Sequence, residues 1–409
     1  MQDFYSIAER LGHDIQALQA GEEVWSTVQV DNIDEFRQLM HDGAPDPVRQ
    51  LRVGYIAADF PDAVDPLNFT ADGLLHRAEQ YIYGDQPLQP QDLDRITPFF
   101  PTTVLAVSAV NKTLQPGEVW DLGTSVTPVV VNLDTLTMES GSSIVIRNSV
   151  LHFNVQTLVR NSGAVPGPNY DLAILGVTGP TGEPGKPGGP GGIGSPGPNG
   201  TCGPGGGTPG DPGGPGGTGK PGSEGHTGGP GGDGLPSIQA NISIGPGGIT
   251  GSAGLFAIYT RSGQGGAGGV GGVGGTGGTG GTGGTGATCG CDHTNSGNGG
   301  DGGKGGAGGT GGTGGNGIRG NNVYVVVPPG QAHKIIATSD FAPPGQGGGG
   351  GAGGPGGPGG NPGKKGGYGS CPHGPSGSPG GSGPSGEPGA LGAPGTASGN
   401  PGNIYVNEG

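Results

Sequence analysis

The chain has 409 residues, of which 105 are glycine and 40 are proline, and only 29% of its residues are apolar. This composition excludes a conventional hydrophobic core along more than half of the chain. The net charge is −15, and residues 1–100 carry eighteen Asp or Glu against six Arg and no Lys. So acidic a balance argues against nucleic-acid binding through a basic surface.

Residues 1–100 predict a small, mainly-α domain. The apolar residues that share one face of a predicted first helix, which Gly21 ends, are Ile7, Leu11, Ile15 and Leu18. Two further helices are predicted over 33–40 and 74–83. Prolines at positions 45, 47, 61, 66, 87 and 90 predict the loops between them. We expect this acidic domain to serve docking or assembly and to have no catalytic role.

Residues 101–175 predict an all-β unit. From Thr103 the apolar residues alternate with a period of two, and short strands are separated by Gly, Ser, Asn and Asp. A solenoid-like β-domain or a small sandwich fits this pattern.

Residues 176–409 predict a third domain in which glycine recurs at every third position. This lattice fills three arms, at 176–234, 263–320 and 345–402, and its phase breaks near the middle of each arm. Strict period-three glycine is typical of left-handed extended helices whose backbones approach closely. We therefore predict three hairpin arms that form a bundle of six antiparallel polyglycine-II helices. At ~3.1 Å per residue, each helix spans on the order of 80 Å.

Short β segments interrupt the arms and predict strands that complete the β-domain. They lie at 238–244, 322–327 and 403–406, and a common motif begins at Asn241, Asn322 and Asn403, with a spacing of 81 residues.

The middle arm has no proline and is closest to a Gly-Gly-X repeat. Since proline lacks the N–H group that lateral bonding needs, we expect the middle arm to lie between the other two.

All cysteines fall at the turns of the arms. Cys202 lies in the first turn, Cys289 and Cys291 in the second, and Cys371 in the third. We expect two disulfides that join neighbouring tips; three pairings are open, and a Cys289–Cys291 bond is disfavoured by ring strain. The alternatives are four reduced thiols or a metal site. The residues of that metal site would be Cys202, Cys289, Cys291, Cys371, His293 and His373.

The arm tips are the chemically varied part of the glycine-rich region. The candidate ligand contacts there are Asp292, His293, Asn295, Lys364, Lys365, Tyr368 and His373. The alternative is that these residues only form turns and add solubilising charge.

Signals for catalysis are poor. The sequence has no Gly-Lys-Ser/Thr phosphate loop and no His-Glu-x-x-His pair. The acidic run of Asp59, Asp62 and Asp65 predicts a polar loop rather than a calcium site, because it lacks the glycine and distal Glu of a known calcium loop. We predict no enzyme activity and no cofactor.

The predicted bundle, stapled by disulfides, resembles the polyglycine-II bundle proteins, among them the snow-flea antifreeze family, over residues 176–402. A β-domain followed by a glycine-rich sandwich is also similar to the tip adhesins of phage long tail fibres. In that family the glycine core is a scaffold and the loops at its far end recognise the receptor.

The resemblance implies a non-enzymatic structural or adhesion protein that recognises a cell-surface or extracellular target with its arm tips. Its acidic residues 1–100 would bind a second copy or a particle or appendage protein. The alternatives are a self-assembling filament or coat protein and an ice-binding protein with a flat Thr face. The first ten residues lack a signal-peptide pattern, and no run of eighteen apolar residues exists. We therefore expect cytoplasmic synthesis, a place on an extracellular or virion surface, and no membrane insertion.

Overall fold

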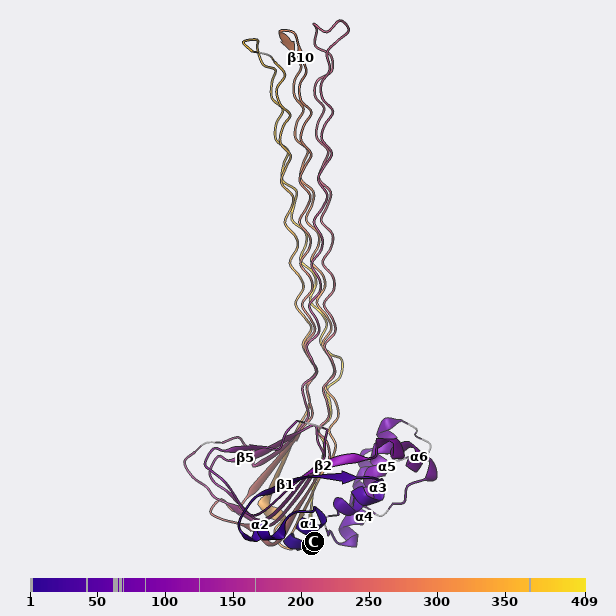
Figure 1. The fold of residues 1–409 in the computed structure, drawn as a ribbon, viewed down its shortest axis with the longest axis vertical. Helices are drawn as coiled ribbons and strands as arrows, with labels where there is room; N and C mark the ends of the chain where they lie inside the picture. The colour runs from indigo at the N-terminus through magenta and orange to yellow at the C-terminus, as the bar shows by residue number, and fades with distance from the viewer. Residues whose placement is uncertain are drawn as a thin grey trace.

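The computed structural model describes residues 3–41, 43–61, 65, 68, 70–84, 86–124, 126–165, 167–367 and 369–409. Sheets and helices form a broad base at one end, and glycine-rich hairpins project from it as long arms (Figure 1).

Within the described residues, the base contains a seven-stranded sheet in the order β1-β2-β4-β6-β8-β12-β14. Every neighbouring pair is parallel except β1 and β2, which are antiparallel. Its strands are β1 (Val24–Val30), β2 (Thr102–Leu114), β4 (Val129–Met138), β6 (Leu151–Arg160), β8 (Ala240–Thr250), β12 (Val323–Val327) and β14 (Ile404–Glu408).

A five-stranded parallel sheet, also counted over the described residues, has the order β13-β9-β7-β5-β3. Its strands are β3 (Val119–Asp121), β5 (Ser143–Arg147), β7 (Leu172–Leu175), β9 (Phe256–Arg261) and β13 (Ile335–Asp340). Side chains of both sheets form one buried apolar cluster, with Leu133, Phe153 and Phe256 at its centre. Strands of the two sheets alternate along the chain, so each passage of the chain adds one strand to each sheet.

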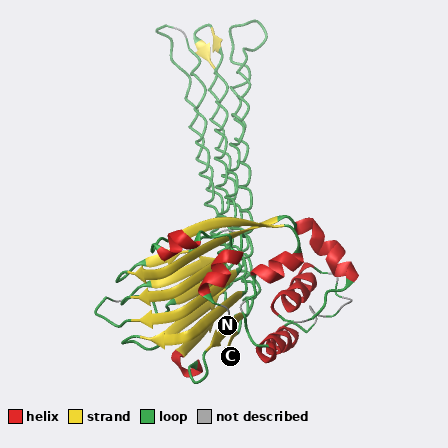
Figure 2. Cartoon of the chain, turned by 60° about the horizontal axis from the view of Figure 1, so that its bottom comes forward, coloured by secondary structure: helices red, strands yellow, loops and turns green. Residues whose placement is uncertain are grey.

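Short helices cover the other face of the larger sheet (Figure 2). The α-helices of the described residues are α1 (Phe4–Arg10), α2 (Ile15–Gln19), α3 (Ile33–Leu39), α4 (Asp46–Asp59), α5 (Ala71–Tyr83) and α6 (Pro90–Ile96). Two 3-10 turns, Thr97–Phe99 and Ala332–Lys334, and a two-residue hairpin, β10 (Thr288–Cys289) with β11 (Asp292–His293), complete the regular structure.

The prediction of a mainly-α N-terminal domain is wrong, whereas the later β segments do complete the β-sheet as expected. The six α-helices of the described part are short, and β1 pairs with β2 along its whole length. Ile7 and Phe36 of the helical layer share a buried cluster with Val104 and Val130 of the sheet. The helices and the sheet are therefore one packed unit, and the sheet extends through β8, β12 and β14 to the end of the chain.

The helix boundaries explain part of the error. The expected first helix is two helices, because Gly12 adopts a φ of +71° between α1 and α2. The helices α4 and α6 were missed because their prolines were interpreted as loop signals. Both begin with proline in the first helical turn, where a missing N–H costs nothing.

The last residue of α4 fixes the helical layer to the end of the sheet. The Asp59 carboxylate accepts hydrogen bonds from the side chains of Asn322 (2.9 Å), Asn403 (2.9 Å) and Tyr405 (2.6 Å). The ring of Tyr55 stacks on Tyr405 with centroids 3.8 Å apart. Asp59 therefore has a structural role, whereas Asp62 of the same acidic run lies outside the described residues.

The arms leave the base in the turns between the two sheets. The first connects β7 to β8, the second connects β9 to β12, and the third connects β13 to β14. Because β7, β9 and β13 are adjacent parallel strands, the outgoing segments begin side by side. The returning segments end side by side for the same reason at β8, β12 and β14.

Backbone hydrogen bonds hold the arms together at every third residue. The Gly179 N–H donates to Gln264 of the second arm, and Gly182 to Ala267, and the series continues to Gly200. The glycine donors of this lattice have N···O distances of 2.7–3.0 Å. The middle arm donates to both flanking arms, since Gly278 bonds to Lys220 and Gly277 to Pro355. It therefore lies between the others, as its lack of proline predicted.

The prediction that the arms are a bundle of six helices is wrong. Along the arms, the structure assigns no helix to any described residue. Each lattice amide bonds to a neighbouring segment rather than within its own, so the i→i−4 hydrogen bonds that define an α-helix are absent there. The arms are extended segments cross-linked by their backbones.

Glycine is required where two segments meet. A Cβ atom built on Gly278 would collide with the carbonyl oxygen of Gly192. By contrast, a Cβ on Gly349 would have Val270 Cγ1 as its nearest neighbour, at 4.0 Å. The close approach of two backbones therefore requires a glycine at Gly278 but not at Gly349.

We predict that Gly278→Ala lowers the stability of the arms by about 1–3 kcal/mol, because the segments must separate and backbone hydrogen bonds weaken. Gly349→Ala, the matched control, has room for its methyl group and should leave stability within about 0.5 kcal/mol. Thermal unfolding followed by calorimetry measures both. Equal stability of the two variants would contradict the packing described.

Candidate functional site: the arm tips

The tips of the three arms lie together at the end of the molecule farthest from the base (Figure 1). The first tip forms at the loop between Thr201 and Asp211, where the Thr201 N–H donates to the Asp211 carbonyl at 2.8 Å. The second is the β10–β11 hairpin, in which Gly290 adopts a φ of +65° that favours glycine. The third closes where the Gly374 N–H donates to Gly366.

Two disulfides join the tips. Cys202 bonds to Cys289 with a Cα–Cα distance of 5.6 Å, and Cys291 bonds to Cys371 with a Cα–Cα distance of 5.3 Å. Each bond links the middle arm to one flanking arm, so the prediction of two inter-arm disulfides is confirmed. The sequence left three pairings open, and the structure selects this one.

The alternative metal site cannot form in this oxidised state, because its four cysteines are bonded in disulfides. A thiolate is the form of cysteine that binds metals, and all four sulfurs are used in covalent bonds. Across the described residues, no group of three or more His, Cys, Asp or Glu side chains has a metal-binding arrangement.

Hydrogen bonds add to the covalent links between the second and third tips. The Gly367 N–H donates to Thr288 Oγ1 at 3.0 Å. Within the second tip, the Ala287 N–H donates to Thr294 Oγ1 at 2.7 Å, and Thr294 is buried. Cys289 is also buried, with 1% of its surface exposed. The tips are thus tied to one another and to the arms below them.

The candidate ligand-contact residues lie on the arm tips that these disulfides and hydrogen bonds join. The side chains that are exposed there are Asp292, Asn295, Lys364, Lys365 and His373. His293 is half-buried, and its Nδ1 has no hydrogen-bond partner in the described structure. Tyr368 lies outside the described residues. Both acidic and basic groups are therefore available on one small surface, whereas Gly, Pro, Thr, Ala and Ser dominate the arms below.

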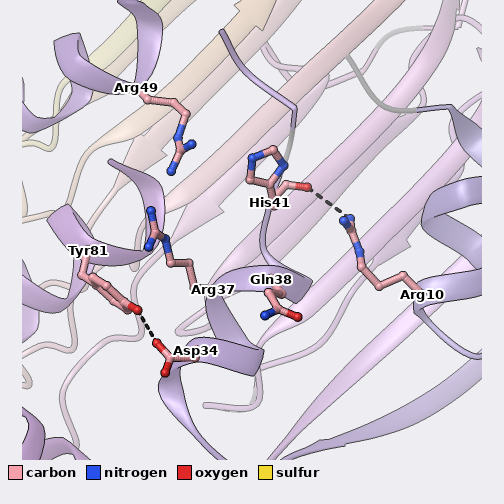
Figure 3. Close-up of a pocket in the computed structure, with 7 residues that line it drawn as sticks. All are labelled: Arg10, Asp34, Arg37, Gln38, His41, Arg49 and Tyr81. Carbon is pink, nitrogen blue, oxygen red and sulfur yellow. Dashed lines mark hydrogen bonds between the residues drawn. The ribbon is translucent and has the colours of Figure 1, made fainter. Parts of the chain in front are cut away.

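The base also contains pockets that no sequence motif predicted. An arginine-rich pocket lies between α1, α3, α4 and α5 (Figure 3), and an apolar one is bordered by Phe36, Leu74 and Phe99. A third lies where Phe60 and Arg319 meet at the foot of the arms. Their residues are distant in sequence, so no local motif indicates them.

Comparisons with known proteins do not identify a family. No protein-family model matches this chain, and no curated protein matches it. Among solved structures, one match is an antifreeze protein of the springtail Granisotoma rainieri, described as a bundle of nine polyproline type II helices. It is 26% identical over 51% of this chain and 93% of that chain, with a TM-score of 0.06. So low a TM-score carries no argument about the fold.

The disulfides point to a non-reducing, extracellular environment, because cytosolic thiols are kept reduced. None of the helices in the described ranges is long and apolar enough to span a membrane.

We predict that the double variant Cys291→Ala/Cys371→Ala frees the third tip and removes about 2–4 kcal/mol of stabilisation. Trypsin should then cut faster after Lys364 and Lys365, which precede the loop. Cleavage after Lys304, in the returning segment of the middle arm, serves as the internal control and should not change. Mass spectrometry of the fragments measures both rates, and equal cleavage of variant and parent at the third tip would contradict the prediction.

Proposed function

We propose that this protein is a non-enzymatic adhesion protein that binds a cell-surface or extracellular target with its arm tips. In this proposal the base attaches the molecule, through residues 1–100, to a particle or surface appendage. The proposal places the protein on the exterior of that particle.

The observation that carries the proposal is the position of the two disulfides. Both lie at the far end of the arms, although the arms are already held by backbone hydrogen bonds along their length. Covalent bonds at the tips fix the relative positions of three loops. A binding surface gains affinity when its loops are held in place before the target arrives.

The shape of the molecule also supports the proposal. The outgoing segments extend on the order of 80 Å at ~3.1 Å per residue, which separates the tips from the base. The paired segments leave little freedom to bend, since each third residue is bonded to a neighbour. A stiff spacer that ends in charged and polar loops is suited to reaching a surface.

The chemistry of the tips is the third support. Lys364, Lys365 and His373 offer donors for carboxylate, sulfate or hydroxyl groups, and Asp292 and Asn295 offer acceptors. Mixed donors and acceptors around a rigid loop are typical of recognition surfaces for polar targets such as glycans and protein loops.

We predict that Lys364→Ala/Lys365→Ala and His373→Ala each reduce target binding at least tenfold without changing the fold. The control is Lys304→Ala, which removes one positive charge from an exposed position on an arm shaft. Labelled full-length protein applied to a glycan array and to immobilised bacterial surface preparations measures the binding. If replacement of every tip residue leaves binding unchanged, or if the shaft variant alone abolishes it, the tips are not the binding surface.

A further inference from the structure

Both sheets of the base end in a strand that has a neighbouring strand on one side only. The larger sheet ends in β14, which pairs with β12, and the smaller sheet ends in β13, which pairs with β9. On its other side, neither strand pairs with any described strand. Neither strand contains proline or lysine, two residues that commonly protect a sheet edge from pairing with another chain. Both edges are therefore open to a further strand.

The two edges lie at the same end of the base, and the space between them is open. A hollow of about 350 Å³ lies there, and its lining residues are Ala337, Thr338, Ser339, Asn403, Ile404 and Tyr405. Five of the six residues of β13 are exposed, whereas its neighbour β9 has one exposed residue in six. The partly buried Ile335 and Val406 lie at the border of the apolar cluster of the two sheets. This end of the base is thus less well covered than the strands behind it.

Every second residue of β14 directs its backbone N–H and C=O groups away from β12. The Val323 N–H of β12 donates to the carbonyl of Asn403, which directly precedes β14. Bonding residues alternate along a parallel pair of strands, so the odd-numbered residues of β14 bond to β12. The residues whose backbone groups face the open side are Ile404, Val406 and Glu408. These groups have no backbone partner within the described structure, so three donors and three acceptors are available at this edge.

The helical layer leaves this edge accessible. The guanidinium of Arg52, in α4, lies over the ring of Tyr324 of β12, 5.9 Å from its centroid. Tyr55, also in α4, stacks on Tyr405 of β14. Both contacts are made by side chains on the face of the sheet. None of the described residues of the helical layer bonds to the outward backbone groups of β14.

We propose that two copies of this protein associate through this end of the base, with β14 of one copy antiparallel to β14 of the other around a two-fold axis. A strand edge matches itself in this arrangement, because donors and acceptors alternate along it. An axis at Val406 bonds this residue to Val406 of the second copy and bonds Ile404 to Glu408 of the second copy. All three outward residues are then paired, and each Glu408 faces an isoleucine rather than another carboxylate.

The presence of two open edges favours a second copy over an unrelated partner. β13 and β14 lie in a fixed relation to one another, and a second copy carries the same two strands with the same spacing. Antiparallel pairing directs the arms of the two copies in opposite directions, so the arms do not obstruct one another. The pairing leaves the arm tips uncovered, and the proposal is independent of their function.

Sedimentation equilibrium of the full-length protein tests the proposal at concentrations from about 1 μM to about 500 μM, a range that includes weak and tight interfaces. The mass of the chain is 39.5 kDa. We expect reversible conversion to twice this mass and no larger species, because a two-fold axis closes the assembly.

Three variants locate the interface. Val406→Pro removes the central outward N–H at an edge position where proline is tolerated, and it should raise the Kd of the dimer at least tenfold. Thr338→Lys places a positive charge from each copy beside the hollow and should raise the Kd at least fivefold. Thr103→Lys is the matched control, since it makes the same change at an exposed position of β2, an interior strand. Thermal unfolding of each variant shows whether it is folded, and Thr338→Lys tests the interface if Val406→Pro is not.

Amide hydrogen exchange at low and high protein concentration identifies the contact directly. The amides of Ile404, Val406 and Glu408 should be protected only in the dimer. The amides of Tyr405 and Asn407, which bond to β12, should be protected at both concentrations and serve as the internal control.

A single species of 39.5 kDa over the whole concentration range would overturn the proposal. A dimer with the same Kd in Val406→Pro, Thr338→Lys and the parent protein would also overturn it, because the copies would then meet elsewhere. Unchanged exchange at the three outward amides would have the same meaning, and species larger than a dimer would contradict the two-fold arrangement.

Discussion

The structure depends on hydrogen bonds between the backbones of extended, glycine-rich segments. Each such bond contributes only about 1 kcal/mol net, but the lattice repeats it at every third residue along all three arms. These bonds form only if the backbones approach within hydrogen-bonding distance, and a side chain at a contact position prevents this. The arms therefore obtain their cohesion from main-chain groups, whereas the base obtains it from the apolar cluster between its sheets.

The base also sets the arrangement of the arms. Leu175, at the end of β7, pairs with Arg261, at the end of β9, and the next bond, from Gly176 to the Arg261 carbonyl, already belongs to the arms. The ladder of a parallel sheet thus continues without interruption into the glycine lattice. Neighbouring strands define which segments are adjacent and in what register, and the disulfides fix the same order again at the far end.

The regular part of this architecture could be predicted from the sequence, because its pattern is local and periodic. The middle arm lacks proline, and this absence predicted that it lies between the other two arms. The 81-residue spacing between Asn322 and Asn403 matches the pairing of Tyr324 with Tyr405. The spacing does not hold for Asn241, which pairs with Tyr324 at a separation of 83 residues.

The irregular part of the architecture could not be predicted from the sequence, since it depends on contacts between segments that are distant along the chain. No local signal places Asp59 against Asn322 and Asn403, more than 260 residues later. The pocket that Arg10 and Arg49 share has the same character, because its helices meet only on the folded sheet. The helical content was misjudged for a different reason: at Pro47 and Pro90, proline begins a helix rather than interrupting one.

The central claim is that main-chain hydrogen bonds hold the arms together, and amide hydrogen exchange measured by NMR tests it most directly. Gly277 and Gly278 of the middle arm donate to different neighbours, whereas no backbone acceptor is found for the amide of Thr279 in the described structure. The account predicts strong protection of the two glycine amides and fast exchange at the threonine, repeated with a period of three along the arm. Uniformly fast exchange along the arm, or protection without this period, would contradict the account.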